Sequence, residues 1–245
     1  MIIAENLVKI YSNNVKALDN VSFRIEQGEI CGYIGTNGAG KSTTIKILAG
    51  IINASSGDAV INNYSVREHS EKVKRIIGYV PESGDLFLSL SAFDFLEFVC
   101  RMYDIDKNTY IKRIHSFAEM FDLKNEINTP MFTFSKGMRQ KVLIISSLIH
   151  NPDIIFWDEP LGGVDYSTTL QIRNLMKELA SAGKTFFYSS HHVESIEKIC
   201  TRIIMLNSGT VVYDNNLNGN IPVEEIFKKY AFPDNSEKIS SVLGT

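Results

Sequence analysis

The stretch with the clearest chemistry is GTNGAGKS, which begins at Gly35 and matches the phosphate-binding pattern G-x-x-x-x-G-K-[ST]. It follows a strand-like apolar run and opens a helix-like run. Gly35, Gly38 and Gly40 allow the backbone to curl so that its N–H groups surround phosphate oxygens at a helix N-terminus. Lys41 offers a positive charge to the outer phosphates, and the Ser42 hydroxyl is a ligand for Mg²⁺. The simpler alternative is a glycine-rich turn before an ordinary helix.

A second acidic element is IIFWDEP, which begins at Ile154. Its four apolar residues predict a buried strand whose end delivers Asp158 toward the same Mg²⁺. Glu159, the next residue, is placed to orient or deprotonate an attacking water. Alternatively, the two carboxylates are only a polar strand exit before Pro160.

Short strand-like runs alternate with helical patterns along the chain, and several runs are apolar on consecutive residues, as in strands covered on both faces. We expect strands at residues 21–27, 28–35, 76–80, 154–158, 185–190 and 202–206. With a helix at 167–183, this order predicts an α/β domain with a largely parallel sheet. From Ser91 to about His150 the pattern is helical throughout, which predicts a helical insertion. From about Pro233 onward we expect a frayed tail.

Composition limits the class of protein. The chain has 245 residues, 44% of them hydrophobic and 22% charged, with 25 basic and 28 acidic side chains and a net charge of -3. The sequence has no long run of charges of one sign, so nothing in it indicates binding to a nucleic-acid backbone or an anionic membrane. The apolar runs fall short of the roughly 18 residues that span a bilayer, and no signal peptide is visible. Cys31, Cys100 and Cys200 are far apart and are expected to be inert buried thiols in a reducing compartment.

Three further segments complete a pattern. FSKGMRQK begins at Phe134, LGGVD ends at Asp165, and SSHHV begins at Ser189 directly after a predicted strand. A histidine at the carboxyl end of a strand points at the crevice where open α/β sheets bind ligands. In this order, and together with the phosphate loop, these pieces resemble the nucleotide-binding subunit of an ABC transporter over about residues 2–225.

The resemblance implies a fold and a reaction. The fold is an α/β P-loop NTPase core with a largely parallel sheet, an N-terminal antiparallel β subdomain and an inserted helical subdomain. Residues 1–225 would form the ATPase domain, with the helical subdomain at about 85–150, and residues 226–245 a C-terminal helix and tail. The implied reaction is ATP hydrolysis, with ATP and Mg²⁺ bound.

In this family, two copies face each other head to tail, and the loop that FSKGMRQK resembles completes the ATP site of the other copy. Ser135 is a good helix N-cap, and Gly137 lets a phosphate approach backbone N–H groups. The segment departs from the common pattern, since Phe134 stands in place of Leu, Lys136 of Gly and Met138 of Gln. The Ser-x-Gly core is kept, which favours the trans role over an ordinary capped helix start.

Other positions carry over one at a time. Tyr11 resembles the aromatic residue that stacks on adenine, although edge packing is an alternative. His191, rather than His192, resembles the histidine that contacts the γ-phosphate. Glu82 in GYVPESGD stands where the family most often has a Gln that reaches Mg²⁺ and the water. A carboxylate there adds negative charge, so we expect slow basal turnover; a polar loop residue is the alternative.

The resemblance therefore implies three sets of site residues. The catalytic set is Glu159, His191 and Lys41, and the metal set is Ser42, Glu82 and Asp158. The nucleotide set is Tyr11, Gly35, Thr36, Asn37, Gly38, Ala39, Gly40, Lys41, Ser42, Thr43, Ser135, Gly137 and Asp165.

The implied partners are a separate transmembrane permease and a second ATPase subunit, in a homodimer or a heterodimer, with no nucleic acid. The chain would then lie in the cytoplasm, peripheral on the inner face of the membrane. Within the helical insertion, Ala92, Phe93, Leu96, Val99, Cys100 and Tyr103 predict a core-facing stripe. Phe95, Phe98 and Met102 form a second stripe that either contacts the permease or packs inside the domain.

Two other classes of ATPase share the phosphate loop. Soluble ABC-type ATPases that act on ribosomes or nucleic acid usually hold two ATPase halves in one chain or long coiled-coil insertions, and this sequence shows neither. A P-loop kinase would lack the segments FSKGMRQK and SSHH. The short C-terminus, the Ser-Lys-Gly-Met variant and Glu82 make the chain more similar to bacterial exporter-type subunits for drugs, antibiotics, lipids or polysaccharides.

Overall fold

The computed structural model describes residues 1–82, 87–191, 193–217 and 222–231, and their strands form two sheets. The antiparallel sheet has the order β2-β1-β4-β5, with β1 Ile2–Ile10, β2 Lys16–Ile25, β4 Ser56–Ile61 and β5 Tyr64–Ser65. The larger sheet has the order β10-β9-β3-β8-β7-β6, with β3 Ile30–Gly35, β6 Ile77–Val80, β7 Ile154–Asp158, β8 Thr185–Ser189, β9 Arg202–Asn207 and β10 Thr210–Asn216. Its pairs are parallel except β9 with β10, so the prediction of a largely parallel sheet is confirmed.

The helices fill the intervals between these strands. They are α1 Lys41–Leu48, α2 Ser70–Ile76, α3 Ala92–Met102, α4 Lys107–Met120, α5 Lys136–Leu148, α6 Tyr166–Ser181, α7 Val193–Ile199 and α8 Val223–Ala231, with a short 3₁₀ turn η1 at Met131–Thr133. Helices α3 and α4 begin at side-chain caps, because Ser91 accepts from the Asp94 N–H and Asp106 accepts from the Thr109 N–H, both at 3.0 Å. The predicted helical insertion is confirmed by α3, α4 and α5, but it is not helical throughout, because residues 121–135 hold only the short turn η1.

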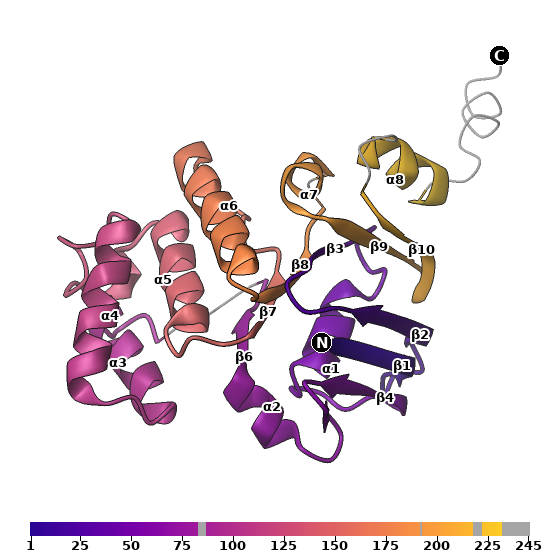
Figure 1. Cartoon of the computed structure of the whole chain (residues 1–245), viewed down its shortest axis with the longest axis horizontal. Helices are drawn as coiled ribbons and strands as arrows, with labels where there is room; N and C mark the ends of the chain where they lie inside the picture. The colour runs from indigo at the N-terminus through magenta and orange to yellow at the C-terminus, as the bar shows by residue number, and fades with distance from the viewer. Residues whose placement is uncertain (83–86, 192, 218–221, 232–245) are drawn as a thin grey trace.

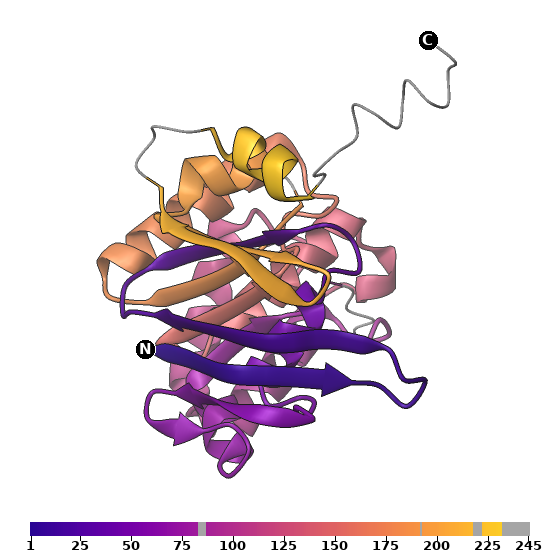
Figure 2. The same cartoon turned by 90° about the vertical axis from the view of Figure 1, so that its right-hand side faces the viewer.

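The elements form three parts in space. Helices α3, α4 and α5 gather at one side of the molecule, the antiparallel strands β1, β2 and β4 lie at the other, and the parallel strands lie between them (Figure 1). Figure 2 shows β1 and β2 running side by side across the face that the antiparallel sheet presents. This is the architecture that the resemblance implied.

The larger sheet has a separate hydrophobic core on each side. On one side, α1 and the antiparallel sheet enclose Phe23, Tyr33 and Phe187, whose ring centroids are 4.7 to 5.9 Å apart. On the other, Trp157 and Phe186 pack with the α-helices, their rings 5.2 Å apart. Burial on both faces explains why the central strands are continuously apolar in sequence.

Strand β2 differs from its prediction. It runs from Lys16 to Ile25, so it starts five residues before the predicted start at residue 21. The sequence did not predict a strand at residues 16–20 because Asp19 and Asn20 are residue types typical of turns. Asn20 instead sits inside the strand with a φ of 54°, where β1 and β2 pair with an irregular register.

The second apolar stripe of α3 divides between core and surface. Phe95 is buried in the core, which agrees with the alternative that this stripe packs inside the domain, whereas Phe98 and Met102 are 46% and 63% exposed. The core-facing stripe holds as predicted for Ala92, Leu96 and Cys100, and Phe93, Val99 and Tyr103 are half-buried. Phe95 enters the core because α4 and α5 cover two sides of α3.

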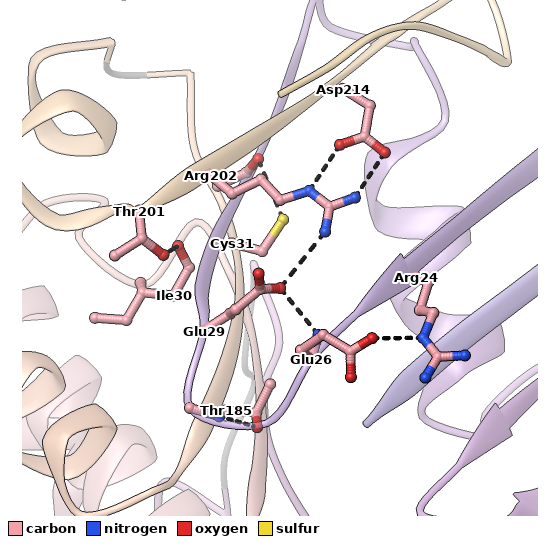
Figure 3. Close-up of polar contacts among 11 residues, drawn as sticks. Arg24, Glu26, Glu29, Ile30, Cys31, Thr185, Thr201, Arg202 and Asp214 are labelled. Atoms are coloured by element: carbon pink, nitrogen blue, oxygen red, sulfur yellow. Dashed lines mark hydrogen bonds and ion pairs between the residues drawn. The ribbon is translucent and has the colours of Figure 1, made fainter. Parts of the chain in front are cut away.

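A polar network ties the strand pair β9–β10 to the turn between β2 and β3 (Figure 3). Arg202 donates from Nε and Nη2 to the two carboxylate oxygens of Asp214, at 2.7 and 2.9 Å. Its Nη1 lies 3.6 Å from Glu29, whose carboxylate also accepts from the Glu26 N–H at 2.9 Å. The two-point pairing with Asp214 raises the pKa of Arg202, so this cation stays charged and holds the edge of the sheet in place.

Helix α8 begins at Val223, so the expected boundary between residues 225 and 226 falls inside a helix, and the tail from Pro233 lies outside the described residues. In the described part of the chain, no helix has the length and apolar character needed to cross a membrane. The prediction of buried thiols is confirmed, because Cys31, Cys100 and Cys200 are all free and buried.

Candidate functional site

The phosphate loop connects β3 to α1 in the way its glycines predict. Gly38 and Gly40 have φ values of 77° and 109°, in the left-handed region that favours glycine. A Cβ atom on Gly40 would lie 2.5 Å from the Ala17 carbonyl oxygen, and one on Gly35 would collide with the carbonyl oxygen of Leu206. Two of these glycines are therefore also required by the packing of the surrounding strands.

Lys41 is the first residue of α1 and is buried. Its Nζ donates to the carbonyl oxygens of Gly35 and Thr36, at 2.8 and 3.1 Å. These bonds fold the Lys41 side chain back over the phosphate loop, so its positive charge lies beside the backbone of Gly35 and Thr36. Thr36 also accepts from the Ala39 N–H at 3.1 Å, which makes the turn of the loop.

The phosphate loop and the acidic residues share one cavity of about 330 Å³. It is lined by Ala17, Asn37, Gly38, Gly40, Lys41, Ser42, Thr43, Glu82, Glu159 and His191. The carboxyl ends of β3, β6, β7 and β8 meet at this edge because the strands are parallel. Residues from four distant parts of the sequence therefore surround the space next to the phosphate loop.

Asp158, at the end of β7, has the features of a metal ligand. Its Oδ1 accepts from the Ser189 hydroxyl at 2.6 Å, while its buried Oδ2 has no hydrogen-bond partner among the described residues. Burial raises the pKa of Asp158, and the nearby hydroxyls of Ser189 and Ser42 partly offset this effect. An ionised, buried and unpartnered carboxylate oxygen is unfavourable by itself, so this oxygen fits a bound cation.

Ser42 and Glu82 complete the oxygen set. The Ser42 hydroxyl donates to Glu82 Oε2 at 3.5 Å, which is a long hydrogen bond. Hydroxyl and carboxylate oxygens are the ligands that Mg²⁺ prefers, so Ser42, Glu82 and Asp158 fit a magnesium ion beside the phosphate loop.

Glu159 directly follows β7 and has an unusual backbone. Its φ is 51°, a left-handed conformation that is uncommon outside glycine. Its N–H donates to the Ser189 hydroxyl at 3.1 Å, and its carboxylate Oε2 lies 2.8 Å from His191 Nδ1. The Glu159 side chain is only 11% exposed, whereas that of His191 is 52% exposed. A carboxylate and an imidazole are thus placed together at the mouth of the cavity.

Comparison with known proteins decides the family. The model of the ABC transporter family matches residues 18–162. The ABC transporter ATP-binding protein NatA of Bacillus subtilis (strain 168) is 36% identical over 81% of this chain and 81% of its own length. The chain is an ABC transporter ATP-binding subunit. The linearmycin resistance ATP-binding protein LnrL of the same organism is 33% identical over 86% of this chain and 68% of its own length.

A solved structure supports the same assignment. The chain is similar to the ATP-binding cassette MJ0796 in a dimeric post-hydrolysis state bound to ADP and Pi, with a TM-score of 0.83 and 28% sequence identity. The superposition covers 89% of this chain and 100% of that one. The ABC subunit described here is therefore an ATPase that binds nucleotide and drives transport, as the resemblance implied.

In this ABC subunit the segment FSKGMRQK lies outside the cavity. Ser135 caps α5 by accepting from the Met138 N–H at 3.2 Å. A Cβ atom on Gly137 would meet only ordinary contacts, the closest at 3.6 Å to the Gly163 carbonyl oxygen. Packing within the chain therefore does not require glycine at 137, unlike at Gly40.

Asp165 and Tyr11 have clear places in the ABC subunit. Asp165 caps α6, accepting from the N–H and the hydroxyl of Thr168 at 2.9 and 2.7 Å, and these bonds lower its pKa. Tyr11 is 39% exposed, and its hydroxyl lies 3.2 Å from Thr43 Oγ1, at the first turn of α1. It lies beside the phosphate loop, although it does not line the cavity.

Two residues of the site were missed from the sequence. In the sequence Ser189 is only one residue of SSHHV, yet its hydroxyl contacts both Asp158 and Glu159. A polar residue ending an otherwise apolar strand was the available signal. Ala17 lines the cavity from the part of β2 that was not predicted, and His192 lies outside the described residues.

Proposed function

We propose that two copies of this subunit, or one copy and a related ATPase subunit, close head to tail around two ATP-Mg²⁺ and drive export through a separate permease. One observation carries the proposal. The cavity holds the phosphate loop, Glu82, Glu159 and His191, whereas Ser135 and Gly137 are placed elsewhere and do not line it. A second subunit that presents these two residues would complete the site, and the dimeric MJ0796 cassette supports this arrangement.

Within one site, the geometry supports the following proposed roles. Lys41 and the loop N–H groups bind the outer phosphates, and Ser42, Glu82 and Asp158 hold Mg²⁺. When bound, Mg²⁺ neutralises charge on the phosphate oxygens. Glu159 orients the attacking water and accepts its proton, while His191 holds the Glu159 carboxylate from the other side.

The permease would contact the groove between the helical part and the core. This groove has a volume of about 450 Å³ and includes Ile51, Arg75, Tyr79, Met102, Tyr103 and His150 in its lining. Next to it on α3 is the exposed Phe98, whose ring packs edge-on against Phe87 at 6.1 Å. Exposed aromatic and methionine side chains around an apolar groove favour a protein partner. The subunit would then lie at the cytoplasmic face of the membrane.

Export is the direction that the relatives favour. The name of LnrL links that protein to linearmycin resistance, which is consistent with removal of a compound from the cell. We therefore propose an exporter-type role, in which the permease selects the transported compound.

The first test removes the proposed base. Glu159→Gln should still bind ATP-Mg²⁺ but hydrolyse it at least ~100-fold more slowly, the scale expected for the loss of a general base. Because the bound ATP then persists, this variant should form dimers on addition of ATP, measured by light scattering after size exclusion.

The control is Glu178→Gln, an equivalent change on α6 away from the cavity, which should keep wild-type turnover. Near wild-type phosphate release by Glu159→Gln would remove Glu159 from the role of base. A variant that binds ATP, fails to hydrolyse it and stays monomeric would contradict the dimer.

A further inference from the structure

Ser189 is the last residue of β8 and is fully buried, with 0% of its surface exposed. It pairs in register with Asp158 of the neighbouring strand β7. Its hydroxyl donates to Asp158 Oδ1 at 2.6 Å and accepts from the Glu159 N–H at 3.1 Å. One side chain therefore bridges the proposed metal ligand and the proposed base.

The direction of these two bonds follows from the inventory of donors. A serine hydroxyl has one hydrogen to donate and can accept through its lone pairs. The ionised Asp158 has no hydrogen to donate, so it must accept the hydroxyl proton, and the Glu159 N–H must be the donor of the second bond. This occupies Oδ1 and leaves Oδ2 without a partner among the described residues.

The second bond acts on a strained backbone. Glu159 has a φ of 51°, and its N–H is held both by the Ser189 hydroxyl and by the Ser189 carbonyl oxygen, at 3.1 and 3.2 Å. A left-handed non-glycine residue persists only where the surrounding contacts hold it. In this conformation the Glu159 carboxylate reaches His191 Nδ1 at 2.8 Å.

We propose that Ser189 is a positioning residue that sets the metal ligand and the base together. Its hydroxyl determines which oxygen of Asp158 is left for the metal and holds Glu159 in the backbone conformation that directs its carboxylate into the site. The proposal rests on the roles of Asp158 and Glu159 given above, and Ser189 acts through these two residues.

The test uses Ser189→Ala, which removes the hydroxyl with almost no change of volume. Binding of Mn²⁺ in the presence of a non-hydrolysable ATP analogue is measured by electron paramagnetic resonance, and turnover is measured separately with Mg²⁺. We expect Mn²⁺ affinity and kcat each to fall about 10-fold to 100-fold, the range for the loss of a residue that orients a metal ligand. Binding of the metal-free nucleotide should stay within twofold of wild type.

The matched control is Ser147→Ala on α5. Ser147 is also buried, and its hydroxyl likewise makes one donated bond, to the Ile144 carbonyl at 2.8 Å, and one accepted bond, from Trp157 Nε1 at 3.0 Å. Its loss should lower thermal stability by a similar amount but leave Mn²⁺ affinity and kcat unchanged.

A second background separates the two arms of the proposal. In a Glu159→Gln protein, Ser189→Ala should still weaken Mn²⁺ binding, but it should lower the residual turnover less than it does in wild type, because the base is already absent. Mn²⁺ affinity and kcat within twofold of wild type for Ser189→Ala, or equal losses for Ser147→Ala, would overturn the inference. If Asp158→Asn leaves Mn²⁺ binding intact, the proposed metal role fails instead, which is a separate result.

Discussion

At the scale of single residues, the cavity is notable for its carboxylates. Glu82 and Glu159 line it, Asp158 lies just behind, and the nearby cation is Lys41. Asp158 is buried while Glu82 is exposed, and these like charges repel each other and the phosphates across the cavity. Burial raises the pKa of Asp158, so its ionised form opposes folding at neutral pH, and a bound cation would offset that cost. The nucleotide should therefore bind mainly as its magnesium complex.

Glu82 allows this charge balance to be tested. Glu82→Gln should keep or raise basal ATPase activity, since the amide still offers an oxygen to the metal while one negative charge is removed. Steady-state phosphate release at saturating ATP-Mg²⁺ measures the effect.

Glu68→Gln, on the exposed segment before α2, serves as the matched change of charge and should leave turnover unaltered. A collapse of activity in Glu82→Gln alone would show that the carboxylate itself is essential.

At the scale of elements, α3 divides between the core and the surface. Phe95 and Leu96 anchor it in the core, while Phe98 and Met102 point away from that core. Tyr103, just after the helix, stacks on His150 with ring centroids 3.8 Å apart and an interplanar angle of 9°. His150 in turn contacts the Ile77 carbonyl oxygen at 2.9 Å. These contacts join the helical part to the strand that leads to Glu82.

The exposed side of α3 is therefore the place to disrupt coupling. Phe98→Ser with Met102→Ser should leave ATPase activity of the isolated subunit unchanged but lower the activity stimulated by its permease at least ~5-fold, because exposed substitutions rarely change stability and interface anchors carry most of the binding energy.

The membrane protein that co-purifies with the wild-type subunit identifies the permease, and the two are then reconstituted in lipid vesicles for the assay. The control is Met120→Ser, at a similarly exposed position on α4, and the permease should stimulate the ATPase activity of this variant as it does that of the wild type. Full stimulation of the α3 double variant would place the contact elsewhere.

At the scale of the whole molecule, the cavity lies at the edge of the larger sheet where β3, β6, β7 and β8 end, whereas Ser135 caps α5. Figure 1 shows α5 among the helices at one side of the molecule and α1, which follows the phosphate loop, at the other. Ser135 accepts its capping hydrogen bond from Met138 of α5. Gly137 has enough space around it for a Cβ atom, so contacts within its own chain do not require glycine there. Lys136 lies across Gly163, where a Cβ atom would be 2.7 Å from its Cδ. The start of α5 and the segment that leads to Asp165 are thus packed against each other.

Mixing two inactive variants tests this arrangement. Lys41→Ala loses its own grip on phosphate, and Ser135→Glu places a carboxylate where the other subunit's γ-phosphate would lie, so each alone should be inactive. A heterodimer contains one complete site, in which the Ser135→Glu chain provides the phosphate loop and the Lys41→Ala chain provides the cap. Phosphate release should recover to about half that of wild type or less, because only part of the mixture forms heterodimers.

Crosslinking resolves a negative result. If proven heterodimers stay inactive, Ser135→Cys is reacted with a γ-phosphate-modified ATP that is held by a tagged partner subunit. Label on the tagged partner's nucleotide supports the composite site, while label found only on nucleotide of the same chain contradicts it.

Local features of the sequence were enough for much of this protein. The phosphate loop can be recognised from the sequence because its residues and the apolar run before it are adjacent in the chain. The same holds for Asp158 and Glu159, which directly follow their own apolar run. The parallel sheet and the helical insertion were predicted for the same reason, since strand and helix periodicity are local properties.

The tertiary structure decided what depends on contacts between distant residues. Ser189 lies 31 residues from Asp158, and only the pairing of β7 with β8 brings its hydroxyl to one carboxylate oxygen and leaves the other unpartnered. Phe95 and Phe98 look alike in sequence, but the packing of neighbouring helices buries one and exposes the other. Hydrogen-bond direction and burial are properties of a position in space, and the one-dimensional pattern does not contain them.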